Sequence, residues 1–495
     1  MMPHCASPDA DAPPSRANAQ GLGLPTRRAH TACHPACKRP GGKMPKTPKE
    51  PVRHNVAAFA IENRVDFLAL SAAPDNSGWV KLQQSGIFDS SSHAPAPCRH
   101  YVFSKDISPT QVHGGKPRQE AYYEEIVRHM KEAINHFIED NEDGLSWLMS
   151  LDEIAISVPG VVENGSTLIQ LPLWEYVSED NVMWRGEKGL NFREVLASII
   201  EDCIEEKGLI WNESRSKKLR KSIFVVNDAS SCAAYYSDDY SAKNPDHRID
   251  LIYMKAHEGI NFGAFERDLW FPSRPHPEYG HIYPNPHERD FRSNFSGSCH
   301  FHGCCLEGVV SMSSFLERAK LARKGLWPLQ EWGDELTKIE RKHHRDDKIK
   351  SEMFDKLFGV GEAAPDLHGG VELLAHYVSQ AIHHILLSPI SPNKIYIGGR
   401  FGKKLIVEAI VENLGVMFNG YPAREGFSRE ALFAMIEAAP TIPDIEGTPD
   451  LIKGRRKLEL LGATVIALSR APYGNTSRPH PDVISIGERQ NRRSK

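Results

Sequence analysis

The feature that most constrains this chain is a stretch near its middle in which cysteine and histidine recur at short intervals. Residues 299–308 read Cys-His-Phe-His-Gly-Cys-Cys-Leu-Glu-Gly, and residues 278–281 read Glu-Tyr-Gly-His. Structural Zn²⁺ sites need four nitrogen or sulfur ligands arranged as a tetrahedron. Three suitable side chains lie three residues apart in the first segment, and the second segment adds a histidine. The spacing predicts a closed zinc site formed by His281, Cys299, His302 and Cys305.

Cysteine usage along the whole chain agrees with a metal site. The chain has nine cysteines, an odd number, and three of them fall within residues 299–305 beside histidines. This distribution favours a metal in a reduced compartment over a framework of disulfides. Cys304 stays open as a substitute for Cys305, although the three-residue spacing from His302 favours Cys305.

Composition and charge narrow the class of partner. Of the 495 residues, 40% are hydrophobic and 25% are charged, and the formal net charge is −4, as in a globular protein of two or three domains. A charge so close to balance indicates no nucleic-acid or acidic-membrane partner and favours a small uncharged substrate. No apolar run approaches the roughly 18 to 20 residues that span a bilayer. The N-terminus lacks the apolar segment of a secretory signal, so we expect a cytoplasmic protein.

The two ends of the chain differ from the rest. Residues 1–51 are rich in Pro, Ala, Arg and Lys without helical or strand periodicity, which predicts a disordered leader, and Met44 is an alternative start. The tail at 473–495 is polar and is expected to be loose.

Strand-like and helix-like segments alternate between these ends. The first cycle has a hairpin at 56–61 and 65–70, a polar insertion to about residue 117, a helix at 118–138 and a buried strand at 154–158. The second has strands at 223–226, 251–254, 264–265 and 394–397 and helices at 304–323, 370–387 and 456–470. Two such cycles predict an α/β protein of two lobes with a cleft between them. The expected lobes are residues 52–225, completed by a C-terminal helix at about 456–472, and residues 226–455 with the zinc loop.

Several short motifs in a fixed order resemble the ROK family (repressors, open reading frames and kinases). The family's zinc motif runs from Glu-x-Gly-His to Cys-x-Glu, and its bacterial fructokinase variant resembles residues 299–308. Further matching motifs lie at 158–160 (Val-Pro-Gly), 227–229 (Asn-Asp-Ala), 397–399 (Ile-Gly-Gly) and 461–463 (Leu-Gly-Ala). The resemblance covers about residues 55–472. It implies the two-lobed ribonuclease-H-like fold of hexokinase and actin.

The resemblance also implies a sugar site. In the family the Asn-Asp pair, the Glu and His of Glu-x-Gly-His and the Glu of Cys-x-Glu hold a hexose or hexosamine. Carried over, these residues are Asn227, Asp228, Glu278, His281 and Glu307, with Asp228 as the catalytic base. Several carboxylate and amide acceptors on rigid elements suit the hydroxyls of a sugar. A second role for Asp228 as a helix N-cap remains open beside this one.

The sequence departs from the family on the ATP side. Family kinases hold ATP phosphates on two glycine-rich turns, where the absence of a Cβ lets backbone N–H groups approach. Here residues 60–64 read Ala-Ile-Glu-Asn-Arg and residues 257–261 read His-Glu-Gly-Ile-Asn. Gly259, Gly398 and Gly399 are the remaining candidates for nucleotide contacts. We therefore expect ATP and Mg²⁺ to bind weakly.

Two classes of function stay open at this point. The first is an ATP-dependent hexose kinase of the fructokinase or glucokinase type, in which Arg64 or Lys255 replaces the missing backbone donors. The second is a non-catalytic sugar-sensing or regulatory protein. Residues 1–54 show no helix-turn-helix pattern, which speaks against DNA binding. A homodimer remains an open expectation.

Overall fold

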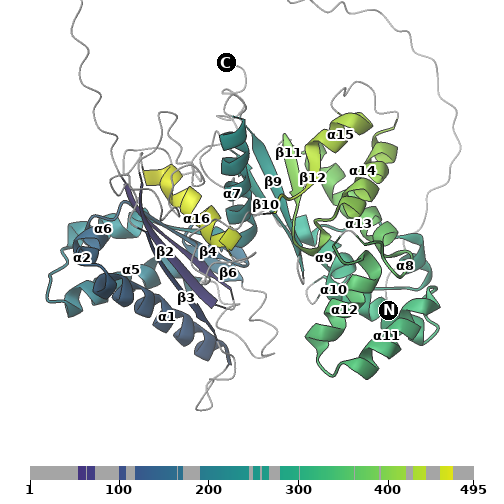
Figure 1. Ribbon diagram of the computed structural model, residues 1–495, viewed down its shortest axis with the longest axis horizontal. Helices are drawn as coiled ribbons and strands as arrows, with labels where there is room; N and C mark the ends of the chain where they lie inside the picture. The colour runs from purple at the N-terminus through teal and green to yellow at the C-terminus, as the bar shows by residue number, and fades with distance from the viewer. Residues whose placement is uncertain are drawn as a thin grey trace, which may run out of the picture. The chain divides into compact units, whose positions relative to one another are not determined.

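A computed structural model of the chain describes residues 54–471 apart from a number of segments (Figure 1). These segments are residues 63, 73–99, 108–117, 164, 171–189, 245–248, 257–258, 267–278, 300–301, 362, 389–391, 420–426 and 442–456. The predicted leader and polar tail both lie outside the described residues. Among the described helices, none is both long enough and apolar enough to span a bilayer.

The first sheet has five strands in the order β3-β2-β1-β4-β8. Its strands are β1 (His54–Ile61), β2 (Arg64–Ala72), β3 (His100–Asp106), β4 (Glu153–Val158) and β8 (Ile223–Asn227). β1, β2 and β3 pair antiparallel, whereas β4 pairs parallel with both β1 and β8. β4 and β8 are buried along their whole length, as expected of parallel strands covered on both faces. Three antiparallel strands followed by two parallel ones form the ribonuclease-H-like arrangement that the resemblance predicts.

The prediction of a polar insertion up to about residue 117 is wrong at residues 100–106, which form strand β3. Among the described residues, the strand lies at the edge of the sheet and pairs with β2 alone. Phe103 is buried, whereas Ser104 and Lys105 are more exposed. An edge strand that buries only part of its side chains gives a weak hydrophobic signal, and here polar segments surround it.

The second sheet repeats the same pattern over four described strands in the order β10-β9-β11-β12. They are β9 (Asp250–Ala256), β10 (Ile260–Glu266), β11 (Lys394–Ile397) and β12 (Ile436–Ala438). β9 and β10 pair antiparallel, and β9, β11 and β12 pair parallel. A small antiparallel sheet contains β5 (Val161–Glu163), β6 (Thr167–Gln170) and β7 (Leu190–Asn191). The fold is therefore α/β with two related sheets, and the lobe boundaries near 225 and 455 stay a prediction.

The helices divide between the faces of the two sheets. The first core joins one face of the first sheet to α1 (Arg118–Asp140), α2 (Gly144–Met149), α5 (Phe192–Glu206) and α6 (Glu213–Ser222). The second core joins its other face, and one face of the second sheet, to α7 (Asp228–Lys243) and α16 (Lys457–Arg470). The third core lies on the remaining face of the second sheet, with α9 (Leu306–Val310), α10 (Met312–Arg323), α11 (Gln330–Lys342), α12 (Asp346–Phe358), α13 (Gly370–Leu387), α14 (Lys404–Phe418) and α15 (Arg429–Met435).

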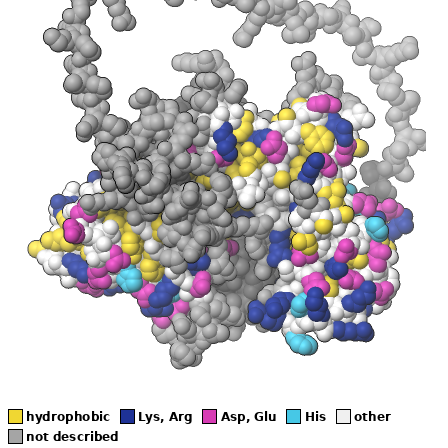
Figure 2. All heavy atoms as spheres, in the orientation of Figure 1, with side chains coloured by type: hydrophobic (Ala, Val, Ile, Leu, Met, Phe, Trp, Pro, Cys, Tyr) yellow, Lys and Arg dark blue, Asp and Glu magenta, His cyan; other side chains and the backbone are white. Residues whose placement is uncertain are grey.

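The helix expected at 304–323 is two helices, because the backbone of Ser311 is extended and its hydroxyl caps α10 by accepting from the N–H of Ser314. Three short elements complete the description: η3 (Tyr279–His281), α8 (Glu288–Arg292) and η4 (Gly399–Phe401). On the face shown in Figure 2, Lys and Arg side chains lie among Asp and Glu side chains, in keeping with the small net charge.

Glycine brings α7 close to its neighbours. A Cβ on Gly462 of α16 would lie 1.8 Å from the carbonyl oxygen of Ser231, and a Cβ on Gly263 of β10 would lie 2.0 Å from the carbonyl carbon of Ala229. Neither position can take a larger residue without moving backbone. The start of α7, which carries Asp228, is therefore held between β10 and α16.

Candidate functional site

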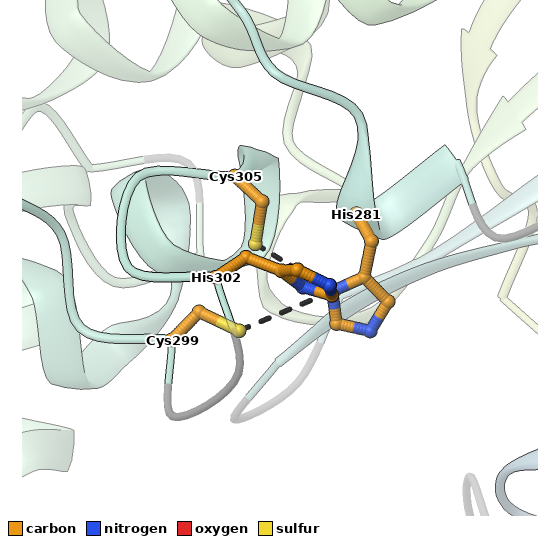
Figure 3. A group of neighbouring side chains, drawn as sticks. All are labelled: His281, Cys299, His302 and Cys305. Atoms are coloured by element: carbon orange, nitrogen blue, oxygen red, sulfur yellow. Dashed lines mark hydrogen bonds between the residues drawn. The ribbon is translucent and has the colours of Figure 1, made fainter.

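The four predicted zinc ligands lie together. The ligand atoms of His281, Cys299, His302 and Cys305 are all within 4.8 Å of one another. Nδ1 of His281 is 3.3 Å from Nδ1 of His302, 3.5 Å from Sγ of Cys305 and 4.0 Å from Sγ of Cys299. Figure 3 shows the four side chains pointing toward one another. Cys305 is buried, whereas Cys304 is exposed and is not among the four.

Glycines and backbone hydrogen bonds shape the loop that carries three of these ligands. Cys299 and Gly303 exchange backbone hydrogen bonds, and Gly303 has a φ of +63°, which favours glycine. A Cβ on Gly308 would lie 1.7 Å from the carbonyl oxygen of Gly303. Leu306 N donates to Ile282 O at 2.8 Å, which ties the start of α9 to the end of η3. These contacts bring the described residues Cys299, Gly303 and Gly308 of the loop close together.

The donor set and the spacing fit a tetrahedral zinc ion. Zn–S bonds of about 2.3 Å and Zn–N bonds of about 2.0–2.1 Å place neighbouring ligand atoms about 3.3–3.8 Å apart. Two of the three distances from His281 fall in that range, and the third exceeds it slightly. Burial, and then the charge of His302, lower the pKa of His281, which favours the neutral imidazole that a metal needs. Burial raises the pKa of Cys305 to about 12, so a thiolate here needs a cation beside it.

His281 also links the cluster to Glu307. Its other ring nitrogen, Nε2, is 3.6 Å from Oε2 of Glu307. Burial raises the pKa of Glu307 to about 7. Oε1 of the same carboxyl would lie 2.4 Å from a Cβ on Gly259, so Gly259 leaves the space in which Glu307 sits. A glycine expected to face a nucleotide therefore packs against a residue predicted to bind sugar.

Asn227 and Asp228 lie where strand β8 ends and helix α7 begins. Asn227 caps the helix: its Oδ1 accepts from Ala229 N and its Nδ2 donates to the carbonyl of Gly160, both at 2.8 Å. Asp228 is the first residue of the helix, and its Oδ1 accepts from the same N–H of Ala229 at 2.8 Å. Asn227 is thus the N-cap, a role considered for Asp228. The second carboxylate oxygen of Asp228 remains for other partners.

That oxygen belongs to an ion cluster centred on Lys255 of β9. Nζ of Lys255 is 2.6 Å from Oδ2 of Asp228 and 2.8 Å from Oε1 of Glu459 on α16. Burial alone would lower the pKa of Lys255, but the charges on Asp228, Glu459 and Glu62 raise it well above its ordinary value. The cluster borders a pocket lined by Ala60, Ile61, Glu62, Arg64, Asp66, Ser157, Asp228, Lys255 and Glu459. Its lining carries four carboxylates and two cations.

The two segments expected to hold phosphates each join a pair of antiparallel strands. Between β1 and β2 only residues 62 and 63 intervene, and Glu62 N donates to Arg64 O at 3.1 Å. Arg64 Nε lies 2.8 Å from Asp66 Oδ1. Between β9 and β10 the described residue of the turn is Gly259, since residues 257 and 258 lie outside the description. The cations considered as phosphate ligands, Arg64 and Lys255, both have carboxylate partners.

Gly398 and Gly399 pack against β9. A Cβ on Gly398 would lie 2.0 Å from the hydroxyl of Tyr253, and a Cβ on Gly399 would lie 1.7 Å from the carbonyl oxygen of Ala256. Gly399 also has a φ of +70°. Close contact with the Tyr253 side chain explains Gly398, and close contact with the Ala256 backbone explains Gly399. The role of both glycines toward a nucleotide stays a prediction.

Of the other predicted site residues, Glu278 lies outside the described part of the chain. Glu459 is the residue that sequence reasoning missed. Its one signal is a carboxylate between Leu458 and Leu460 in a helix that is otherwise largely buried. No feature of the sequence near Glu459 indicates that Lys255 is its partner.

Solved structures of similar proteins align with most of the chain at low identity. A ROK family glucokinase from Streptomyces griseus, in complex with glucose and AMPPNP, is 16% identical with a TM-score of 0.43, covering 83% of this chain and 97% of that one. A ROK family transcriptional regulator described as a homolog of the E. coli MLC protein is 15% identical with a TM-score of 0.46, covering 85% and 79%. The fold assignment depends on the strand order of the two sheets and not on these structures.

Sequence comparison is more specific. The fructokinase of Streptococcus mutans is 30% identical over 103 residues, which are 21% of this chain and 33% of that protein. A putative fructokinase of Bacillus subtilis is 24% identical over 171 residues, 34% of this chain and 43% of that protein. The chain therefore matches between a third and a half of the length of these relatives. Residues 210–428, which contain Asn227, Asp228, Glu307 and the four-ligand cluster, match the sequence model of the ROK family. Through this region the chain is similar to the ROK family.

Proposed function

We propose that this protein binds a hexose or hexosamine at a site formed by Asn227, Asp228, Glu278, His281 and Glu307, next to a structural zinc ion. Phosphorylation of that sugar by ATP is proposed to be much slower than in family kinases with intact glycine turns, or absent. The fructokinase relatives support the sugar class.

One observation carries the proposal. One ring nitrogen of His281 lies near the other three cluster residues, and the other ring nitrogen lies near Glu307. Nδ1 lies 3.3–4.0 Å from the three other ligand atoms, and Nε2 lies 3.6 Å from the Glu307 carboxylate. A metal at the cluster would fix the imidazole, and the imidazole would then fix the direction of a sugar-binding carboxylate. A zinc ion here supplies rigidity to the loop.

Asp228 and the pocket beside it favour weak phosphoryl transfer. In the reaction, the sugar hydroxyl oxygen bonds to the γ-phosphorus of ATP, the bond to the β-phosphate oxygen breaks to leave ADP, and a base takes the hydroxyl proton. Asp228 is the proposed base. The pocket beside it has four carboxylates against two cations, an excess of negative charge that repels phosphate. Positioning and electrostatics are nearly the whole of phosphoryl-transfer catalysis, so this charge weighs against a fast kinase.

The test is the thermal shift of purified protein with a panel of hexoses and N-acyl hexosamines. We expect a sugar to raise the melting temperature of the wild type, and Glu307→Gln to abolish most of the shift. Hydrogen bonds to the sugar hydroxyls are each worth about 0.5–3 kcal/mol, depending on the charge of the group that makes them. Glu317→Gln is the matched control, since that side chain lies on α10 and is 46% exposed. Its shift should equal that of the wild type. A panel that gives no shift at millimolar concentration contradicts the proposal.

The alternative function is a sugar-binding protein without catalysis, which the ion pair between Lys255 and Asp228 favours. A coupled kinase assay on the same preparations separates the two. Any turnover that comes from this site should fall about 10²- to 10⁴-fold in Asp228→Asn.

A further inference from the structure

Lys255 lies where three segments far apart in the sequence converge. Its ammonium is 2.6 Å from Asp228 at the start of α7, 2.8 Å from Glu459 in the first turn of α16, and 3.8 Å from Glu62 in the β1–β2 turn. The exposed fractions of the Lys255, Asp228 and Glu459 side chains are 14%, 11% and 15%. These charges are thus held together with little water around them.

Without the ammonium, this arrangement would be unfavourable. Carboxylates brought close together repel one another, and burial makes that repulsion stronger. An oxygen-lined site of this kind is what hard divalent cations bind, with Ca–O distances of about 2.3–2.6 Å. Of the two nearer N–O distances at Lys255, 2.6 Å equals the upper end of that range and 2.8 Å exceeds it only a little. The ammonium therefore stands close to where a bound divalent ion would be.

A second observation points to the same pocket. The hydroxyl of Ser157, at the end of β4, lines the pocket and is almost fully buried. It has no hydrogen-bond partner among the described residues. A buried hydroxyl without a partner costs about 1–3 kcal/mol. It is one more oxygen ready for a cation or a water molecule.

The geometry points to Lys255 as a built-in cation, whose ammonium fills the carboxylate pocket beside Asp228 and keeps divalent metal ions out of it. A reaction at Asp228 would then take place next to the fixed +1 charge of the Lys255 ammonium rather than next to an exchangeable divalent metal ion. The inference goes beyond sugar binding and does not depend on it.

The experiment is titration with Mn²⁺, without sugar or nucleotide, followed by electron paramagnetic resonance. The proteins are the wild type, Lys255→Ala, Lys255→Met and the double variant Lys255→Ala/Glu459→Gln. We expect each single variant to bind one Mn²⁺ more than the wild type does. The dissociation constant of this ion should be about 10⁻⁴ to 10⁻³ M, as in weak oxygen sites. The affinity should be about tenfold or more above that of the wild type. The double variant should lose most of this gain, which assigns the ion to the pocket.

Lys243→Ala is the control, because this lysine also pairs with an aspartate but is 61% exposed on α7. It should bind Mn²⁺ as the wild type does. If the Lys255 variants are unstable alone, Mn²⁺ should restore their folding. Failure to fold with or without Mn²⁺ would overturn the inference, and so would folded variants that bind no more Mn²⁺ than the wild type. Wild-type protein that binds Mn²⁺ and loses it on Glu459→Gln would overturn it too. Sugar-induced stabilisation of the wild type tests the proposed function separately.

Discussion

At the scale of single residues, burial distinguishes two adjacent cysteines that look alike in the sequence. Cys305 is the N-cap residue of α9, is fully buried and places its sulfur 3.5 Å from His281 Nδ1. Cys304, one residue earlier, is exposed. Adjacent side chains leave a backbone in different directions, so only one of the two faces the cluster.

Zinc content should follow this difference. Purified wild type is expected to carry about one zinc per chain by elemental analysis, and chelation should lower its melting temperature, because metal binding is coupled to folding. Cys305→Ser should lose most of the metal, whereas Cys304→Ser should keep it. Metal-free wild type of unchanged stability would contradict the zinc site, and equal loss in both variants would contradict the choice of Cys305.

At the scale of elements, one buried ion pair anchors the short helix α8, which lies along the chain between η3 and the loop that carries Cys299, His302 and Cys305. Asp290 receives hydrogen bonds from Arg318 at 2.9 and 2.6 Å, from Trp327 at 3.1 Å and from Tyr377 at 2.6 Å. Arg318 is completely buried. Burial alone would raise the pKa of Asp290, but these donors keep it below its ordinary value. A five-residue helix with little core of its own is thereby anchored to α10 and α13.

Asp290→Asn should therefore be strongly destabilising. It leaves the guanidinium of Arg318 buried without a countercharge, which costs about 3–5 kcal/mol when one partner of a buried pair is removed. Glu288→Gln on the same helix is the control, because the ion pair with Arg292 is largely exposed and should change stability by less than about 1 kcal/mol. Urea denaturation of the three proteins measures the difference. Similar values for the two variants would show that the buried pair does not anchor α8.

At the scale of the whole molecule, α16 ties the end of the described chain to the first sheet. The helix packs on α7, β1 and β4, and Arg470 Nε lies 3.0 Å from Glu153 Oε2. Burial raises the pKa of Glu153 to about 7, although Arg470 counteracts it. Between its ordinary value of 4.5 and about 7, the folded protein therefore holds a proton at Glu153 that the unfolded chain has lost.

This proton predicts how stability depends on pH. Because the folded state binds more protons in that window, the contribution of Glu153 is fully present below pH 4.5 and is lost as the pH rises through about 7. The rise in pKa corresponds to at most about 3 kcal/mol. We expect the unfolding free energy of the wild type to fall by up to this amount relative to Glu153→Gln between pH 5 and pH 8. Parallel curves for the two proteins would show that Glu153 titrates normally.

The sequence by itself predicted a cysteine–histidine cluster in which Cys305 was favoured over Cys304, the order of most strands and helices, and the resemblance to the ROK family. These features depend on residue spacing within short segments and on the periodicity of hydrophobic residues, and both can be read from neighbouring positions of the sequence. The sequence did not predict β3, because this edge strand buries only part of its side chains and lies between polar segments. Tertiary structure decided that Cys305 joins the cluster, that Glu307 lies against Gly259, and that Lys255 meets Asp228 and Glu459. Those contacts join segments that are separated along the chain, and the packing of the two sheets around α7 and α16 brings Lys255, Asp228 and Glu459 together.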